Sequence, residues 1–224
     1  MALHREDVVR AALELLDEVG LDRLTTRALT DRLGVQRGAL YWHVRSKQEL
    51  LGAMADAVVA GVFTAPGTGD GADNGAQAGW AGRTADFAHR LRGALLARRD
   101  GARLVSAHLA PGAATLGAVE EGLALMRAQG LALAQAAMFG HAVTSYVIGF
   151  VLQEQAAHTG TEAGAGAGSG ADGDDRADAG TAPPVDPRRY PHLAQWQAEQ
   201  PADPDQAFSA GLAFLTAGLA AQLS

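Results

Sequence analysis

The fold of this chain is decided by the stretch from residue 24 to residue 47, which runs Leu24-Thr-Thr-Arg-Ala-Leu-Thr-Asp-Arg-Leu-Gly-Val-Gln-Arg-Gly-Ala-Leu-Tyr-Trp-His-Val-Arg-Ser-Lys47. Leu29 and Leu33 lie four residues apart, so they share one face of a helix that Gly34 ends. Leu40 and Val44 have the same spacing and predict a second short helix directly after the turn. Two short helices joined by a tight turn predict a helix-turn-helix.

The side chains between these apolar positions indicate what the second helix contacts. Six must point outward, namely Gln36, Arg37, Ala39, Tyr41, Trp42 and His43. Two adjacent aromatic residues on an exposed face are typical of a helix that lies in a DNA groove. From Arg23 to Lys47 there are five Arg and one Lys against the single acid Asp31, although the whole chain has a net charge of −7. A cationic patch on an acidic protein favours a DNA-binding face over a helical hairpin with a solvated basic face.

The same stretch resembles the DNA-binding domain of the tetracycline repressor (TetR) family, and specifically its tetracycline-repressor subgroup. The matching motifs are Leu24-Thr-Thr-Arg27, Leu33-Gly-Val35, Leu40-Tyr-Trp-His-Val44 and the following Lys47. The similarity continues through residues 94–102 and, more weakly, through residues 143–155. The resemblance implies an N-terminal three-helix helix-turn-helix domain followed by a larger C-terminal helical domain that binds a ligand and dimerises.

Composition agrees with a helical, cytoplasmic protein. The 224 residues are 48% hydrophobic, and Ala and Leu recur at helical spacing without the alternation of strands, which predicts an all-α fold. The absence of cysteine excludes disulfides, thiolate metal sites and cysteine nucleophiles. The polar, acidic start of the chain has no apolar signal-peptide segment, so we expect a cytoplasmic location.

Patterning along the chain predicts three parts. Residues 1–46 form the helix-turn-helix domain, residues 47–63 a connecting helix, and residues 64–224 the ligand-binding and dimerisation domain. Within the last part, the Gly/Ala/Asp-rich segment 159–187 is expected to be disordered. A first helix is expected from Arg5 to Val19, closed by Gly20. Either Thr25 or Thr26 is expected to cap the next helix.

Two apolar helices are expected to form the core and the dimer interface. Residues Leu131–Leu152 contain no charged side chain, and we interpret them as a buried central helix rather than a membrane span, because polar residues and glycines interrupt the run. The final helix, Pro204–Leu223, combines small residues with a stripe of large apolar ones. A homodimer held by both helices is expected, and Leu215→Arg is expected to break it.

The resemblance also assigns roles on the DNA side. Phosphate contacts are expected from Thr26, Tyr41, His43 and Lys47. Base contacts are expected from Arg27, Gln36 and Arg37, whose side chains fork onto guanine or adenine edges. Gly38 and Ala39 permit close approach, and Trp42 packs on the sugar edge. Arg37-Gly38 replaces the Gln-Pro of tetracycline-responsive members, so the resemblance implies the docking mode but not the operator sequence.

The ligand side departs further from the family pattern. The family's magnesium-binding His and Glu fall near Val105 and at Gln153, a neighbouring pocket His falls at Ser145, and the drug-contacting His and Asn fall at Phe63 and Phe87. Neutral residues at these positions predict a hydrophobic effector bound without magnesium. The expected pocket residues are Phe63, Phe87, Leu91, Val105, His108, Thr144, Ser145, Tyr146 and Gln153, although most of the polar ones could equally be hydrogen-bonded core residues.

These observations leave three functions open. The first is a ligand-responsive homodimeric repressor of a palindromic operator, which needs a hollow core. The second is a constitutive DNA-binding regulator whose filled core only dimerises. The third is an enzyme, which is disfavoured because the chain contains no Gly-x-Ser-x-Gly and no His-Glu-x-x-His motif. No metal and no other cofactor is expected.

Overall fold

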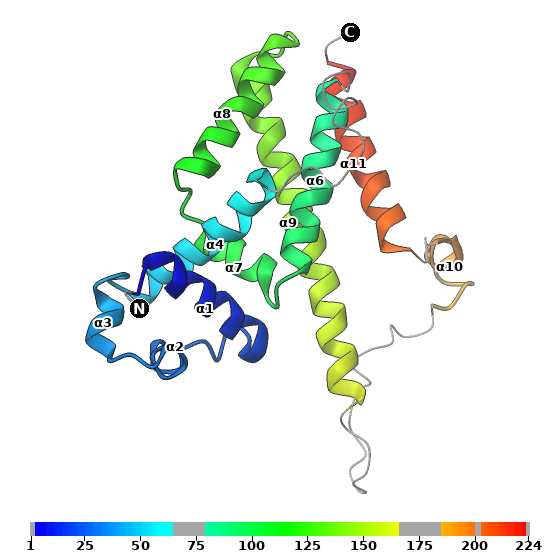
Figure 1. Ribbon diagram of the computed structural model, residues 1–224. Coiled ribbons are helices and arrows are strands. Elements are labelled where there is room, and N and C mark those ends of the chain that lie inside the picture. Colours follow the sequence, from blue (N-terminus) through cyan, green and yellow to red (C-terminus); the bar gives the residue numbers. More distant parts are fainter. Residues whose placement is uncertain (1–2, 65–78, 166–184, 200–202, 223–224) are drawn as a thin grey trace, which may run out of the picture.

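The computed structural model describes residues 3–64, 79–165, 185–199 and 203–222, and within them it contains helices and no strand. In chain order the helices are α1 (Arg5–Val19), α2 (Thr26–Leu33), α3 (Arg37–Tyr41), α4 (Lys47–Thr64), α6 (Trp80–Leu96), α7 (Gly101–His108), α8 (Ala113–Ala128), α9 (Leu133–Ala165), α10 (Pro191–Glu199) and α11 (Pro204–Ala220). Figure 1 shows a small head formed by α1–α3 and a larger core formed by α6–α9 and α11, with α4 running from one to the other and α10 lying to one side of the core. The all-α fold with a helix-turn-helix head is confirmed.

The head forms where local signals are strong. Helix α1 has the expected bounds and ends at Gly20, whose φ of 77° is readily adopted only by glycine. Thr25 caps α2, because its hydroxyl accepts a hydrogen bond from the Ala28 N–H at 3.1 Å. Gly34 ends α2 in the left-handed conformation, with φ 65°. The turn of the helix-turn-helix therefore follows directly from Gly34.

Helix α3 is shorter than its apolar spacing predicts. It ends at Tyr41, and Val44 lies beyond it, although the Val44 N–H still bonds to the Leu40 carbonyl at 3.1 Å. Leu40 and Val44 are both buried, so the two inward positions were assigned correctly. The chain leaves the helix early because the start of α4 immediately needs Ser46 as its cap.

The start of α4 is held by the Ser46 hydroxyl and by two contacts of the Glu49 carboxylate. The Ser46 hydroxyl accepts the Glu49 N–H at 3.0 Å, as a capping box requires. The Glu49 carboxylate accepts the Arg45 N–H at 2.8 Å, one residue earlier than the motif predicts, and also pairs with Arg5 at 2.7 Å. The Arg45 backbone donor, followed by Arg5, lowers the pKa of Glu49 below its usual range.

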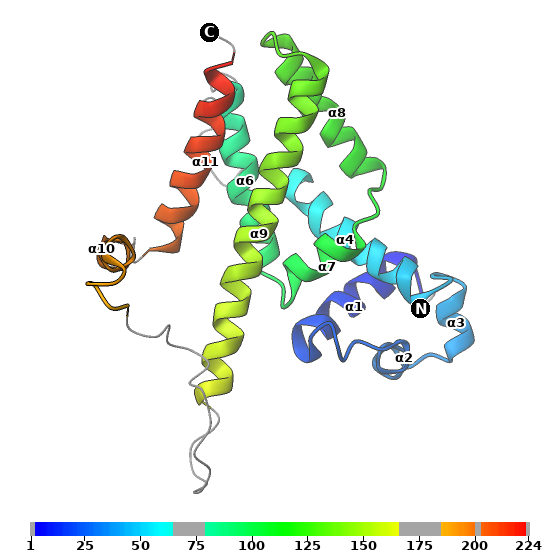
Figure 2. The same cartoon turned by 180° about the vertical axis from the view of Figure 1, so that it is seen from behind.

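The core is built around α9, which packs against α6, α7, α8 and α11 (Figure 2). Residues Leu133–Ala157 are long and apolar enough to cross a membrane by length and composition, and 28% of the tested window is buried. The prediction of a buried central helix was therefore wrong in part. One side of α9 contributes Val143, Val147 and Val151 to the core, whereas another side is exposed and uncharged.

Helix α9 also extends further than expected. It continues to Ala165, past residue 159 where disorder was predicted to begin. Once a helix has formed, each added residue gains a backbone hydrogen bond, so α9 propagates through this Pro-free segment despite Gly160 and Gly164. Residues 166–184 of the predicted insertion lie outside the described residues.

Polar contacts join the head to the core. Arg98 pairs with Asp17 at 2.6 Å, and Arg103 pairs with Asp22 at 2.9 Å. The Leu21 N–H donates to the Asp100 carboxylate at 2.8 Å. The Arg103 side chain lowers the pKa of Asp22 by hydrogen bonding and charge. The end of α1 is therefore attached to the corner between α6 and α7, which sets how the head lies on the core.

Candidate functional site

The head presents an exposed face along α3 and the turn that follows it. Leu40 and Val44 are buried under this segment, which directs the residues between them outward. Trp42 is 88% exposed and Tyr41 is 46% exposed, so two large aromatic rings face solvent next to Arg37. Such rings and cations are suited to the sugars, phosphates and bases of a DNA groove.

The ten residues expected to contact DNA lie at the start of α2, on α3 and the adjoining residues, and at the start of α4. Seven are exposed, namely Arg27, Gln36, Arg37, Gly38, Tyr41, Trp42 and Lys47, and three are half-buried, namely Thr26, Ala39 and His43. Arg27 reaches Asp31 only at 4.0 Å between two exposed groups. Among the described residues, the side chains of Arg37 and Lys47 form no hydrogen bond or ion pair, so their charges are available to a polyanion.

One residue that supports this face was missed. Arg5, in the first turn of α1, donates to the His43 carbonyl oxygen at 3.0 Å as well as to Glu49. These bonds hold the turn after α3 against α1. In the sequence Arg5 is indistinguishable from a solvated surface arginine, since its partners lie about forty positions away.

The core contains a pocket of about 730 Å³ between α6, α8 and α9, with Phe63 from the end of α4 in its wall. Aromatic side chains in its wall pack against one another in pairs. Phe63 and Phe87 stack with centroids 5.6 Å apart, and Trp80 meets Phe139 edge to face at 5.5 Å. A volume of this size, lined mainly by apolar groups, accommodates a drug-sized molecule.

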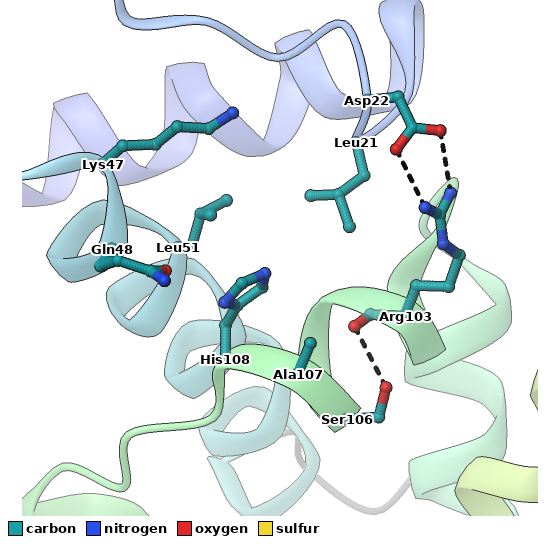
Figure 3. Close-up of a pocket in the computed structure, with 9 residues that line it drawn as sticks. All are labelled: Leu21, Asp22, Lys47, Gln48, Leu51, Arg103, Ser106, Ala107 and His108. Carbon is teal, nitrogen blue, oxygen red and sulfur yellow. Dashed lines mark hydrogen bonds and ion pairs between the residues drawn. The ribbon is translucent and has the colours of Figure 1, made fainter.

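Three of the nine expected pocket residues line this pocket, namely Phe63, Phe87 and Thr144. Leu91 and Val105 are buried in the core at 1% and 2% exposure, and His108 lines a separate cleft next to the head (Figure 3).

The other three expected pocket residues lie elsewhere on α9. Ser145 and Gln153 lie on its exposed side, and the Tyr146 hydroxyl donates to the Phe208 carbonyl oxygen at 2.8 Å. The structure does not bring these three residues into the wall of this pocket, and the uncharged sequence around them gives no sign of which side of the helix faces a cavity.

The pocket is also more polar than expected. Charged or titratable side chains in its wall are Arg83, Asp86, Arg90, Glu121 and His141. The Arg90 side chain donates to the Val62 carbonyl oxygen at 3.1 Å, whereas the Arg83 side chain forms no hydrogen bond or ion pair within the described part of the chain. The sequence could have placed Arg83 and Arg90 in the pocket wall. They lie four residues before and three residues after Phe87, so all three share one face of the helix.

Fold and site together define a helix-turn-helix DNA-binding protein in which one helix joins the head, with its cationic segment from Arg23 to Lys47, to a core with a ligand-sized pocket. The model of bacterial regulatory proteins of the tetR family matches residues 8–54, and that of the tetracyclin repressor-like C-terminal domain matches residues 73–223. The chain therefore belongs to the TetR family, as the sequence resemblance predicted.

Individual relatives agree. The class A tetracycline repressor from transposon 1721 of Escherichia coli is 36% identical over 220 residues, which are 97% of this chain and 91% of that protein. A possible TetR family transcriptional regulator from Streptomyces coelicolor A3(2) matches with TM-score 0.74 and 34% identity, over 97% of this chain and 98% of that one. A TetR variant from Acinetobacter baumannii AYE in complex with minocycline matches with TM-score 0.68 and 32% identity, over 99% of both chains. The family and these relatives are transcriptional regulators rather than enzymes.

Proposed function

We propose that this protein is a cytoplasmic, ligand-responsive transcriptional repressor that binds a palindromic operator as a homodimer and is released by a hydrophobic small molecule without magnesium. The observation that carries the proposal is the course of α4. Its first residue, Lys47, belongs to the expected DNA face, and Phe63 near its other end lines the core pocket. The pocket supports this function over the constitutive alternative, which requires a filled core.

On the operator, the exposed residues divide by chemistry. Arg37 and Gln36 lie at the start of α3, which in a helix-turn-helix contacts base edges. Lys47 is a point charge suited to a backbone phosphate. Arg37 and Gln36 should therefore determine which operator sequence is preferred, whereas Lys47 should contribute affinity for DNA of any sequence.

Arg37→Ala is expected to cost about 1–3 kcal/mol of operator binding and to relax preference at one base pair of each half-site. Lys47→Ala should weaken binding to all sequences alike and reduce the slope of log K against log salt by about one for each lysine removed. Fluorescence anisotropy at several salt concentrations measures both effects. Arg188→Ala, which removes the same charge from an exposed site near α10, is the control. Selection from random DNA should yield an inverted repeat, and its absence would contradict operator recognition.

The proposed homodimer interface consists of two exposed helix surfaces that carry no charged side chain. On α9 the exposed positions include Ala134, Met138 and Ser145, and Met138 is 65% exposed. The neighbouring α11 exposes Phe214 at 78%, together with small residues on either side. Uncharged helix faces with small residues favour close association with a second copy.

For the effector we propose a molecule with a flat, multi-ring apolar body. The rings of Phe63, Phe87 and Trp80 provide faces and edges for stacking. Polar groups of the ligand would meet the charged side chains of the wall, including Arg83 and Glu121. The minocycline complex of a relative is consistent with a ligand of this size.

A hydrogen-bonded link between α4 and α8 provides a route from the pocket to the head. The Asp56 carboxylate, on α4, accepts the Gly112 N–H at 2.9 Å and the Thr115 hydroxyl at 2.7 Å. Thr115 is buried, and both donors lie at the start of α8, the helix that forms one wall of the pocket. A ligand that displaces α8 would therefore pull on α4 and tilt the head.

Operator release is expected with hydrophobic multi-ring ligands, and equally so with and without EDTA. To shift the ratio of released to bound dimer from 1:99 to 99:1, a ligand must bind the released state more favourably by about 5.5 kcal/mol. By linkage, operator DNA then weakens ligand binding by the same free energy. A gel-shift titration with ligand, combined with calorimetry on the free protein, measures release and binding separately. A requirement for magnesium, or tetracycline as the best inducer, would contradict the metal-free proposal.

Asp56→Ala separates binding from release. Because Asp56 does not line the pocket, the variant should bind ligand as the native protein does but require more ligand for release. Thr115→Val removes one of the two bonds and should have a smaller effect. Unchanged release by Asp56→Ala would exclude this route.

A further inference from the structure

We propose that a second cleft, between head and core, binds a small organic anion, either an aromatic carboxylate or a phosphate monoester. The cleft has a volume of about 700 Å³ and shares no residue with the effector pocket. Its walls come from the segment after α1, the first turn of α4, and α7 (Figure 3). Figure 3 shows Lys47 and His108 on one side of the open space and the Arg103–Asp22 pair on the other.

The charges of the cleft favour an anion. Asp22 is its acidic residue, and Arg103 already binds that carboxylate through two nitrogens, at 2.9 Å and 3.3 Å. Lys47 attracts Asp22 at longer range, yet within the described residues neither the Lys47 nor the His108 side chain forms a hydrogen bond or ion pair. A carboxylate or phosphate between them would give the ammonium group a partner and accept a hydrogen bond from the imidazole.

The remaining walls suit an apolar body attached to that anion. Leu21 and Leu51 extend toward the open space from opposite sides, and Ala107 lies below it (Figure 3). Inorganic anions would leave these groups in water, whereas an aromatic ring would cover them. The favoured ligand is therefore a small aromatic acid rather than a free ion.

Occupation of the cleft should oppose DNA binding, an expectation that rests on the proposed function. Lys47 is the expected phosphate contact, and one ammonium group directed at a ligand in the cleft is withdrawn from the DNA backbone. The walls also belong to both head and core, so a ligand between them would restrain the movement of the head. The cleft would thus act as a second effector site, separate from the core pocket.

The test uses benzoate and phenyl phosphate as ligands and neutral benzamide as their matched control, on the full chain at constant ionic strength. Calorimetry and the NMR signals of the His108 ring should detect binding of the two anions and at least fivefold weaker binding of benzamide. Lys47→Gln and His108→Leu should each weaken anion binding at least fivefold. Arg83→Gln, in the core pocket, should leave it unchanged, and thermal melting checks that each variant is folded.

Equal binding of benzamide, anion binding that either cleft variant leaves unchanged, or loss of binding in Arg83→Gln would overturn the assignment. A second measurement follows operator affinity. Phenyl phosphate should lower it for the native protein but not for His108→Leu. If the protein binds anions in the cleft but no operator exists, the proposed function fails and the anion site stands.

Discussion

The Phe214→Arg variant is expected to be monomeric at micromolar concentration and to bind operator at least about a hundredfold more weakly, a loss of about 2.7 kcal/mol. Phe214 is 78% exposed on α11, on a surface without charged neighbours along the helix. In a dimer formed through this surface, the arginine would be buried against uncharged side chains, where it costs several kcal/mol. A monomer contacts only one half-site, so the affinity contributed by the second head is lost.

Sedimentation velocity and operator titration measure the two effects. Gln206→Arg places the same charge on an exposed position near the polar start of α11 and is the control. A dimeric Phe214→Arg protein would exclude α11 as the interface. The variant expected from the sequence, Leu215→Arg, is less informative, because Leu215 is partly buried against the core of its own chain. That substitution would destabilise the fold as well as the dimer.

The Arg92→Met variant is expected to lose about 3 kcal/mol of unfolding free energy. Arg92 is 8% exposed and binds Glu154 through two nitrogens, at 2.9 Å and 2.5 Å, and Asp205 at 2.5 Å. Its guanidinium also lies 5.0 Å from the centre of the Phe208 ring. The hydrogen bonds that Arg92 donates to Glu154 raise the pKa of Arg92, so the arginine stays charged. It joins α6, α9 and α11, and its removal takes the guanidinium from the Glu154 carboxylate, whose side chain is only 12% exposed.

Urea denaturation at fixed protein concentration measures this loss, since the stability of a dimer depends on concentration. Arg92→Met combined with Glu154→Leu should recover most of it, because the carboxylate that required the guanidinium is then absent. Arg10→Met, which breaks an exposed ion pair with Asp7, should have little effect. A loss in Arg92→Met no larger than in Arg10→Met would contradict the buried pair's role.

The sequence by itself determined the head. Its signals act over three to five residues: the apolar pair Leu29 and Leu33, the turn at Gly34, and the buried pair Leu40 and Val44. A helix whose apolar side is distinct from its polar side specifies its own orientation, so the exposed aromatic and basic residues could be identified before any contact was known. The length of α3 was not determined in this way, because the cap of the next helix set it.

Only the tertiary structure decided which sides of α9 and α11 face the core, the pocket and solvent. Residues 133–153 of α9 and 206–220 of α11 carry no charged side chain, so no periodic signal distinguishes Phe139, which lines the pocket, from Ser145 and Gln153, which are exposed. The pocket wall likewise combines Arg83 on α6 with Glu121 on α8, which are distant in sequence. Residues that only packing between helices brings together share no short-range sequence pattern. For this reason the expected DNA face could be predicted from the sequence, whereas the ligand pocket required the fold.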